Sequence, residues 1–329
     1  MRSKYPWLSL LYKQILIHYK QLSSYHAILL HGQPGNGEDI LCYFISMWLL
    51  CNKKTDIEIC GVCNNCKLMK LGNCPDFYKL EPLKNFLKLG IDDIRDVINN
   101  LHNSPHHNGN KVVWLPRSES MTKQASNALL KILEEPPLNT YFILSCKILK
   151  YLLPTIKSRC LYWYIPVPSE NLGIKWLKYN GGYNSYISRI ALRLCGGGPL
   201  IAKSILHPLR WQERIILYDT LYRAIYSYNM LLLLPLLKLS KDDWSLHWLL
   251  TLINDSIKCK LGLYKFLINY DKFFLINIIA KFCSIETLHI QWQYWFFYLR
   301  QKHEIDGVNC ELLLVNGLLS WERCLNNVK

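Results

Sequence analysis

The sequence predicts an α/β domain built on a parallel sheet, followed by a small helical lid and an all-helical C-terminal domain. Up to about residue 165, short apolar strands alternate with helical patterns, and this alternation is typical of a parallel sheet with helices on both faces. Pro166 and Pro168 then interrupt the pattern. From Pro208 onward, apolar residues recur at helical spacing without strand alternation. We therefore expect three domains, at 1–166, 167–207 and 208–329.

The elements of the first domain follow from local apolar patterns. Short apolar runs predict strands buried in the sheet, and apolar residues spaced by three and four predict helices packed on it. The strands are expected at 27–30, 76–80, 111–115, 141–145 and 161–165, and the helices within 1–25 and at 40–50, 91–101 and 125–135. In the second domain we expect helices around 172–177 and 187–194, split by the glycines at 196–198.

A glycine-rich turn lies between the first strand and the following helix. Gly32 and Gly37 have the spacing G-x-x-x-x-G of a phosphate-binding P-loop, with Gly35 between them. A working P-loop continues with Lys and then Ser or Thr, whereas this chain has Glu38 and Asp39. Two carboxylates there would repel a triphosphate. We predict a degenerate P-loop that does not bind ATP productively; a plain strand-to-helix turn is the alternative.

The strand at 111–115 also lacks the residues of an ATPase. In P-loop ATPases such a strand ends in acidic residues that hold the metal and polarise water. Here Pro116, Arg117, Ser118 and Glu119 follow it. This is a second loss, independent of the first.

The helix at 125–135 ends in two acidic residues and two prolines. Pro136 and Pro137 cannot continue a helix. Glu134 and Glu135 then lie at its C-terminal end, where the helix dipole disfavours each anion by about 0.3–1 kcal/mol. We expect both carboxylates to be solvated; pairing with a basic neighbour is the alternative.

Four cysteines form the clearest chemical motif. Cys51, Cys60, Cys63 and Cys66 have the spacing C-x8-C-x2-C-x2-C. Four thiolates satisfy tetrahedral Zn²⁺, and a site with no open position for water is structural. An iron–sulfur cluster and unligated thiols are the alternatives, but the fourth cysteine of the ferredoxin run is missing. We expect a structural zinc ion held by these four residues.

The overall charge favours an anionic partner. The 329 residues carry a formal net charge of +15, and nucleic acid is the first candidate for such a chain. The lysines are scattered and form no long basic run, so direct DNA contact stays open. Apolar runs are shorter than the roughly 20 residues that cross a bilayer, and the N-terminus lacks a signal-peptide core. We expect a soluble cytoplasmic protein without membrane contact.

Together these motifs resemble the delta-prime subunits of bacterial DNA polymerase III, in the AAA+ clamp-loader family. The similarity covers nearly the whole chain and is densest in the first 165 residues. The motifs that carry it are Tyr5-Pro6-Trp7, Pro34-Gly35-Asn36-Gly37, the four cysteines, Lys111-Val112-Val113-Trp114, Asn127-Ala128-Leu129-Leu130-Lys131, Leu133-Glu134-Glu135-Pro136-Pro137 and Ser158-Arg159-Cys160.

The resemblance implies an ATPase-like domain, a lid and a C-terminal collar domain. The collar assembles a five-subunit ring with delta and gamma/tau subunits, and the ring places the sliding clamp on primed DNA during replication. Delta-prime subunits of this family do not bind nucleotide productively. Active relatives also carry a lid arginine after a Gly-Ser turn, which is missing at Gly198-Pro199-Leu200.

The resemblance assigns catalytic importance to one residue. Arg159, within the motif Ser158-Arg159-Cys160, is expected to act as an arginine finger on the ATP of a neighbouring subunit. Pairing with an acid at the subunit interface is the alternative role. Two rival functions for the whole chain are an active AAA+ ATPase with an atypical P-loop and a zinc-dependent nucleic-acid-binding protein.

Overall fold

The computed structural model describes residues 4–21, 26–82, 88–101, 103, 105–106, 109–239, 243–304 and 309–326. The chain divides into two compact units, Met1–Leu172 and Gly173–Lys329. The first contains the sheet and the second is helical. The predicted separation of a lid at 167–207 from a collar at 208–329 stays a prediction.

The sheet of the first unit has five parallel strands in the order β2-β3-β4-β1-β5. The central strands are buried on both faces, which explains their nearly continuous apolar sequence. All five predicted strands are confirmed, with small changes at their ends. Their bounds are β1 (Ala27–Gly32), β2 (Phe77–Lys79), β3 (Lys111–Leu115), β4 (Thr140–Cys146) and β5 (Leu161–Ile165).

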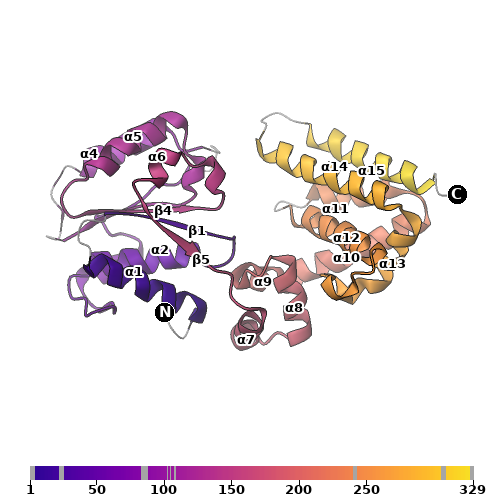
Figure 1. Cartoon of the computed structure of the whole chain (residues 1–329), viewed down its shortest axis with the longest axis horizontal. Coiled ribbons are helices and arrows are strands. Elements are labelled where there is room, and N and C mark those ends of the chain that lie inside the picture. Colours follow the sequence, from indigo (N-terminus) through magenta and orange to yellow (C-terminus); the bar gives the residue numbers. More distant parts are fainter. Residues whose placement is uncertain are drawn as a thin grey trace. The chain divides into compact units, whose positions relative to one another are not determined.

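Helices cover both faces of this sheet (Figure 1). On β1, Ile28 and Leu30 pack in the core beneath α1 and α2, and Leu29 packs in the core on the opposite face, beneath α4, α5 and α6. The sheet thus sits between two helical layers, as predicted. The helices of this unit are α1 (Ser9–Gln21), α2 (Glu38–Leu50), α3 (Asn64–Leu71), α4 (Ile91–Leu101), α5 (Lys123–Glu134) and α6 (Pro154–Lys157), with 3-10 turns η1 (Pro6–Leu8), η2 (Ser118–Ser120) and η3 (Leu149–Tyr151).

The second unit is helical throughout its described residues. Trp248, Trp295 and Trp321 are fully buried in one core that spans most of its helices. The elements are α7 (Glu170–Gly181), α8 (Ser185–Leu194), α9 (Pro199–Ile205), α10 (Pro208–Tyr226), η4 (Met230–Leu233), α11 (Leu234–Leu239), α12 (Trp244–Lys260), η5 (Tyr264–Phe266), η6 (Tyr270–Lys272), α13 (Phe273–Phe282), α14 (Ile285–Glu304) and α15 (Cys310–Asn326).

One expected helix break was placed wrongly. The glycines at 196–198 separate α8 from α9, and α7 is instead separated from α8 at residues 182–184. Gly197 has φ 93° and donates from its N–H to the Leu192 carbonyl at 2.8 Å, which closes the C-terminal end of α8. Gly182, with φ 67°, makes the corresponding left-handed turn after α7.

A membrane-spanning helix needs about 20 predominantly apolar residues. Among the described residues, no single helix combines the necessary length and apolar character. The segments Tyr270–Phe282 and Ile285–Lys302 reach that length and apolar character only when they are taken together. The chain bends by 112° between them.

Candidate functional site

The backbone of the glycine turn needs glycine at three positions. It joins the end of β1 to the start of α2, and Gly35 and Gly37 have φ values of 86° and 95°. Only glycine adopts this left-handed region freely. At Gly32, a Cβ atom would lie 2.9 Å from the Cβ of Ile165 on β5, so this position also excludes a side chain. The glycines are therefore required by the local geometry.

The N-terminal residues Tyr5–Trp7 pack against this turn, and Trp7 forms a hydrogen bond with it. The indole Nε1 of Trp7 donates a hydrogen bond to the Asn36 carbonyl at 2.7 Å, and Asn36 is completely buried. Tyr5 packs edge-on against the Trp7 ring, with ring centroids 6.0 Å apart. The motif Tyr5-Pro6-Trp7 thus contacts the turn directly, a link across 29 residues that the sequence pattern did not reveal.

Glu38, at the position of the P-loop lysine, is buried. Its side chain is only 9% exposed. Burial, with a smaller contribution from the Asp39 carboxylate, raises the pKa of Glu38 to about 7. Burial therefore favours the neutral form of Glu38 relative to an exposed carboxyl, a shift that the sequence did not reveal. Asp39 is exposed.

The cavity beside the turn is small. It has a volume of about 70 Å³ and is lined by Glu38, Asp39, Glu81, Pro116, Arg117, Ser145, Cys146 and Lys147. Pockets that hold drug-sized ligands usually measure roughly 300–1,000 Å³. This cavity, as formed by the described residues, has room for only a few water molecules.

The residues that follow β3 differ from the acidic residues found there in P-loop ATPases. Arg117 has a positive φ of 54°, and the Ser118 hydroxyl donates to the Ser145 carbonyl at 3.0 Å. Glu119 accepts a hydrogen bond from the Lys147 N–H at 3.3 Å. Its carboxylate also adds to the rise in the pKa of Glu38. Glu119 is thus the first acidic residue after β3, and it lies near the buried Glu38.

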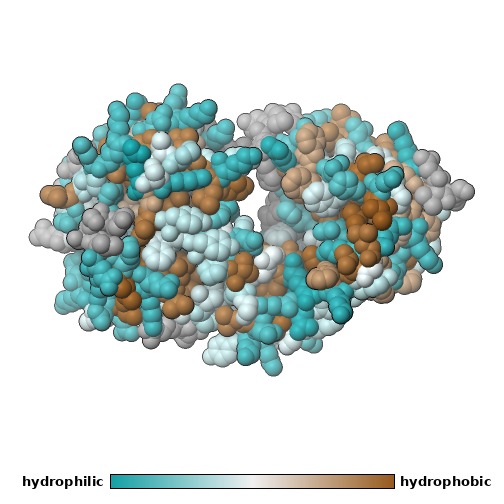
Figure 2. Space-filling view, viewed as in Figure 1, coloured by the Kyte–Doolittle hydropathy of each residue, from teal (hydrophilic) through white to brown (hydrophobic). Residues whose placement is uncertain are grey.

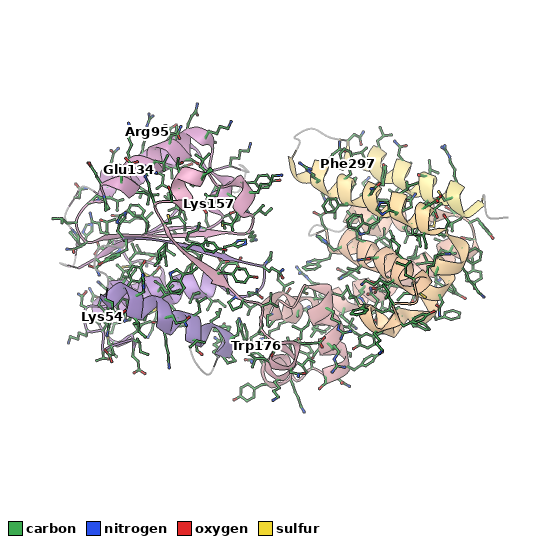
Figure 3. The ribbon with its side chains drawn as sticks, viewed as in Figure 1. Lys54, Arg95, Glu134, Lys157, Trp176 and Phe297 are labelled. Atoms are coloured by element: carbon green, nitrogen blue, oxygen red, sulfur yellow. The ribbon has the colours of Figure 1, made fainter. Side chains whose placement is uncertain are left out.

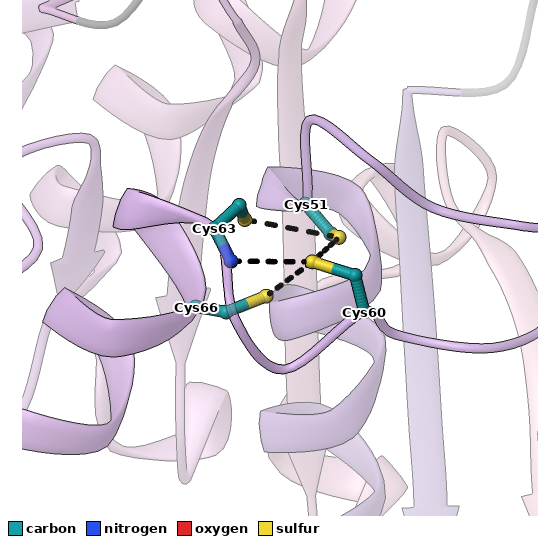
Figure 4. Close-up of side chains that lie close together, drawn as sticks. All are labelled: Cys51, Cys60, Cys63 and Cys66. Atoms are coloured by element: carbon teal, nitrogen blue, oxygen red, sulfur yellow. Dashed lines mark hydrogen bonds between the residues drawn. The ribbon is translucent and has the colours of Figure 1, made fainter.

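The four predicted cysteines converge on one point (Figure 4). The Sγ atom of Cys51 lies 3.5 Å from that of Cys60 and 4.0 Å from that of Cys63, and the Sγ atoms of Cys60 and Cys66 are 3.9 Å apart. Four sulfurs at about 2.3 Å from a tetrahedral ion are separated by about 3.8 Å. The cluster therefore has the size and donor set for a metal ion such as zinc.

Local structure prepares these thiols for a metal. Cys51 ends α2, Cys63 precedes α3, and the Cys63 N–H donates to the Cys60 sulfur at 3.3 Å. Hydrogen bonds from the backbone of Cys63 and Val62 lower the pKa of Cys60 to about 6. The Lys54 ammonium, which interacts electrostatically with Cys51, lies 4.4 Å from the centre of the Trp48 ring. The aromatic face thus holds this cation near the cluster. The pKa of Cys63 is lowered as well, whereas burial raises the pKa values of Cys51 and Cys66, so the thiolate form is favoured at only two of the four positions.

Arg159 lies in the short segment between α6 and β5. The Ser158 hydroxyl and the Nη1 atom of Arg159 both donate to the Thr155 carbonyl, each at 3.0 Å. Cys160 is buried in the core beneath α5 and α6. The backbone at Arg159 is therefore fixed from both sides. Cys160 is buried in the core, and the Ser158 hydroxyl closes the preceding helical turn.

Arg159 also forms an ion pair with Glu134, the last residue of α5, which Figure 3 labels. The side chains are 33% and 50% exposed, respectively. The expectation that Glu134 is simply solvated is therefore wrong, and pairing with a basic neighbour, the alternative considered above, is correct. The sequence did not reveal which cation would approach, because the two residues lie on different elements.

The glycine turn and Arg159 lie at opposite ends of two neighbouring parallel strands. Strands β1 and β5 are parallel neighbours, with Ile28 opposite Leu161 and Gly32 opposite Ile165. The turn follows the C-terminal end of β1, whereas Arg159 precedes the N-terminal end of β5. At about 3.3 Å per residue, roughly 16 Å of strand separates them. The fold does not bring the arginine to the chain's own glycine turn.

Comparisons with known proteins agree with the fold and motifs. A family model described as DNA polymerase III, delta subunit, matches residues 9–168, and a model of its C-terminal part matches residues 208–323. The chain is 39% identical to the DNA polymerase III subunit delta' of Yersinia pestis, over 98% of this chain and 96% of that protein. It belongs to the DNA polymerase III delta-prime family. The Escherichia coli delta' subunit is 34% identical, again over 98% and 96%.

Members of this family are related to the gamma subunits of the same polymerase. The gamma subunit of Buchnera aphidicola from Acyrthosiphon pisum is 30% identical over 47% of this chain and 42% of its own length. A gamma subunit-related protein from Thermotoga maritima has the same fold, with a TM-score of 0.50 at 22% identity over 95% of this chain and 98% of that one. The chain is therefore a DNA polymerase III subunit of the AAA+ clamp-loader family.

Proposed function

We propose that this chain is a non-hydrolysing clamp-loader subunit that supplies Arg159 to the ATP site of a neighbouring subunit. In this role it helps a ring of delta and gamma/tau subunits to place the sliding clamp on primed DNA in the cytoplasm. The observation that carries the proposal is the separation of Arg159 from the chain's own glycine turn. Because Arg159 lies at the other end of the strands from this turn, an ATP molecule that it contacts would belong to another subunit.

Three features support the absence of ATP hydrolysis by the chain itself. Glu38 replaces the lysine that contacts the β- and γ-phosphates, and Asp39 replaces the metal-binding hydroxyl residue. The adjacent cavity of about 70 Å³ is much smaller than a nucleotide site. Pro116 stands where an ATPase has an acidic residue. These losses affect phosphate binding, metal binding and water activation separately.

A guanidinium suits the role of a finger. Phosphoryl transfer develops charge on the equatorial oxygens of the γ-phosphate, and an arginine supplied by a second protein stabilises that charge. Arg159 is partly exposed and stands on a backbone fixed by Ser158 and Cys160. A lysine at this position would keep the charge but lose the planar fork that contacts two oxygens.

The surface of α14 supports assembly through the helical unit. Ile290, Phe296 and Phe297 are each more than half exposed, and the rings of Trp292 and Phe296 stack 5.2 Å apart. They line an open groove of about 590 Å³ that Arg300 also borders. Figure 2 shows hydrophobic side chains gathered on the surface of the C-terminal helices. Exposed apolar groups of this extent are typical of protein interfaces. We assign this surface to contact with a neighbouring collar domain.

The cysteine cluster supports a structural role for zinc. All four donors are sulfur, and no position is left for water, so the ion would hold the loop between α2 and α3 in place. Chelation, or replacement of Cys63 by Ser, should release zinc and expose this loop to protease while DNA binding is unaffected. If either treatment instead abolished tight, salt-sensitive DNA binding by the isolated chain, a zinc-dependent nucleic-acid-binding function would replace our proposal.

The decisive experiment is copurification with candidate partners. The full chain, coexpressed with gamma/tau and delta subunits of its own organism, should be recovered in one stoichiometric complex that hydrolyses ATP. The isolated chain should neither bind ATP with micromolar affinity nor turn it over. Mg²⁺-dependent hydrolysis by the isolated chain would contradict the proposal and favour an active ATPase with an unusual P-loop.

A further inference from the structure

The side chain of Arg159 is turned back onto its own unit. Its Nη1 atom donates to the Thr155 carbonyl at 3.0 Å, and its Nη2 atom pairs with Glu134 on α5. A guanidinium has N–H donors on three nitrogens, and here both terminal nitrogens are engaged within the same unit. An arginine that acts on the phosphate of a neighbour must first redirect at least one of them.

Glu134 occupies an electrostatically unfavourable position that this pair compensates. It is the last residue of α5, where the unpaired carbonyls of the helix end repel a carboxylate. The cation of Arg159 offsets that repulsion. Glu135, the next residue, is equally an exposed carboxylate at this helix end but forms no ion pair within the described parts of the chain. Proximity to the helix end alone therefore does not explain the contact of Glu134.

The pair is weak enough to be exchanged. Arg159 is 33% exposed and Glu134 is 50% exposed, so water screens their attraction. Ion pairs of this exposure shift an equilibrium by no more than about fivefold, which corresponds to about 1 kcal/mol. A phosphate offers more negative charge and accepts two parallel N–H bonds from the same fork. It can therefore displace the carboxylate.

We propose that Glu134 is a positioning residue that holds the Arg159 guanidinium against the end of α5 until a neighbouring subunit presents a nucleotide phosphate. The proposal rests on the finger role of Arg159 described above. It adds that the finger is withdrawn in the free chain and is released by exchange of one anion for another. Assembly with a nucleotide-bound neighbour thus sets the position of the arginine.

The free, full-length chain provides a test that does not depend on any partner. Phenylglyoxal modifies accessible arginines, and mass spectrometry of the Arg159 peptide gives the rate at this one side chain, with Arg95 as the internal reference. Glu134→Gln should raise the Arg159 rate about twofold to fivefold, whereas the matched variant Glu135→Gln should leave it unchanged. Equal rates in the unmodified chain and in Glu134→Gln would overturn the proposal.

The assembled complex provides the second readout. Without clamp or DNA, Glu134→Gln should raise the kcat for ATP by up to about fivefold and leave the KM unchanged, since the finger is more often extended. A fall in the kcat of the Glu134→Gln complex would show that Glu134 keeps Arg159 in its active position. It would overturn the proposal that Glu134 holds the arginine away from the neighbouring ATP. If Arg159→Ala leaves kcat unchanged while the labelling result holds, the finger role fails and the hold by Glu134 stands. If Arg159→Ala lowers kcat but Glu134→Gln does not change the labelling rate of Arg159, the finger role stands and the hold by Glu134 fails.

Discussion

The glycine turn and the Arg159 segment differ in what their local structure fixes. At the turn, Gly32, Gly35 and Gly37 permit a backbone and a close approach that a residue with a side chain could not easily adopt. At Arg159, neighbouring groups fix the backbone, and a charged side chain projects from it. The turn therefore contributes packing, whereas under our proposal the Arg159 segment contributes a charged group to a partner.

The largest effect is expected at the arginine. In the assembled complex, Arg159→Ala should slow hydrolysis at the neighbouring site by on the order of 10³-fold or more, because the transition-state charge loses its guanidinium. Steady-state ATPase and clamp-loading assays measure the effect, and size-exclusion chromatography should show intact assembly. Arg95→Ala, which removes an exposed arginine of the same unit, serves as the control. Unchanged rates in the Arg159 variant would remove the contrast between the two regions.

A smaller effect is expected from the backbone of the turn. Gly32→Ala places a Cβ atom 2.9 Å from the Cβ of Ile165, and overpacking of this kind costs about 1–3 kcal/mol. Urea denaturation should show this loss in the free energy of unfolding. At Gly90, a new Cβ would meet only the Asp93 carboxylate at 3.4 Å, so Gly90→Ala should be nearly neutral. Equal stability of the two variants would contradict a structural role for the turn.

The burial of Glu38 predicts a dependence of stability on pH. Its folded-state pKa is raised from 4.5 to about 7, so the folded chain binds the proton more tightly than the unfolded chain. This contribution is fully present below about pH 4.5 and is lost as the pH rises toward 7. Glu38→Gln is always neutral and should therefore be more stable than the unmodified chain at pH 8 but similar at pH 4.5.

Denaturant titrations at both pH values measure this difference. Glu135→Gln, at an exposed carboxylate, should show no such change between the two conditions. If Glu38→Gln gained no stability at pH 8, the carboxylate would be better solvated than its buried position indicates.

The smallest effect is expected when the missing P-loop side chains are restored. The double variant Glu38→Lys with Asp39→Thr should show no ATP turnover, because Pro116 still occupies the acidic position after β3 and the lid arginine is missing. A sensitive phosphate-release assay of the isolated chain tests this. Turnover by the double variant would mean that the turn is a nearly intact nucleotide site rather than a structural remnant.

Local patterns in the sequence were sufficient for the elements and for the metal cluster. Strands β1 to β5 and helices α1, α2, α4 and α5 were predicted because buried runs and helical spacing are properties of adjacent residues. The short helices α3 and α6 were not predicted. The cysteines were recognised because three of the four are close in sequence. The misplaced break near α8 shows the limit of this approach, since a run of glycines marks a helix end without indicating which helix it ends.

The sequence by itself determined the identity of the chemical groups: a glycine turn without its lysine, four thiols with zinc spacing and one arginine in the motif Ser158-Arg159-Cys160. Only the tertiary structure decided their state. Burial set the pKa of Glu38, Trp7 fastened the turn across 29 residues, and Glu134 met Arg159 from another helix. Desolvation and ion pairing depend on distances between segments remote in the chain, which residue types alone do not specify.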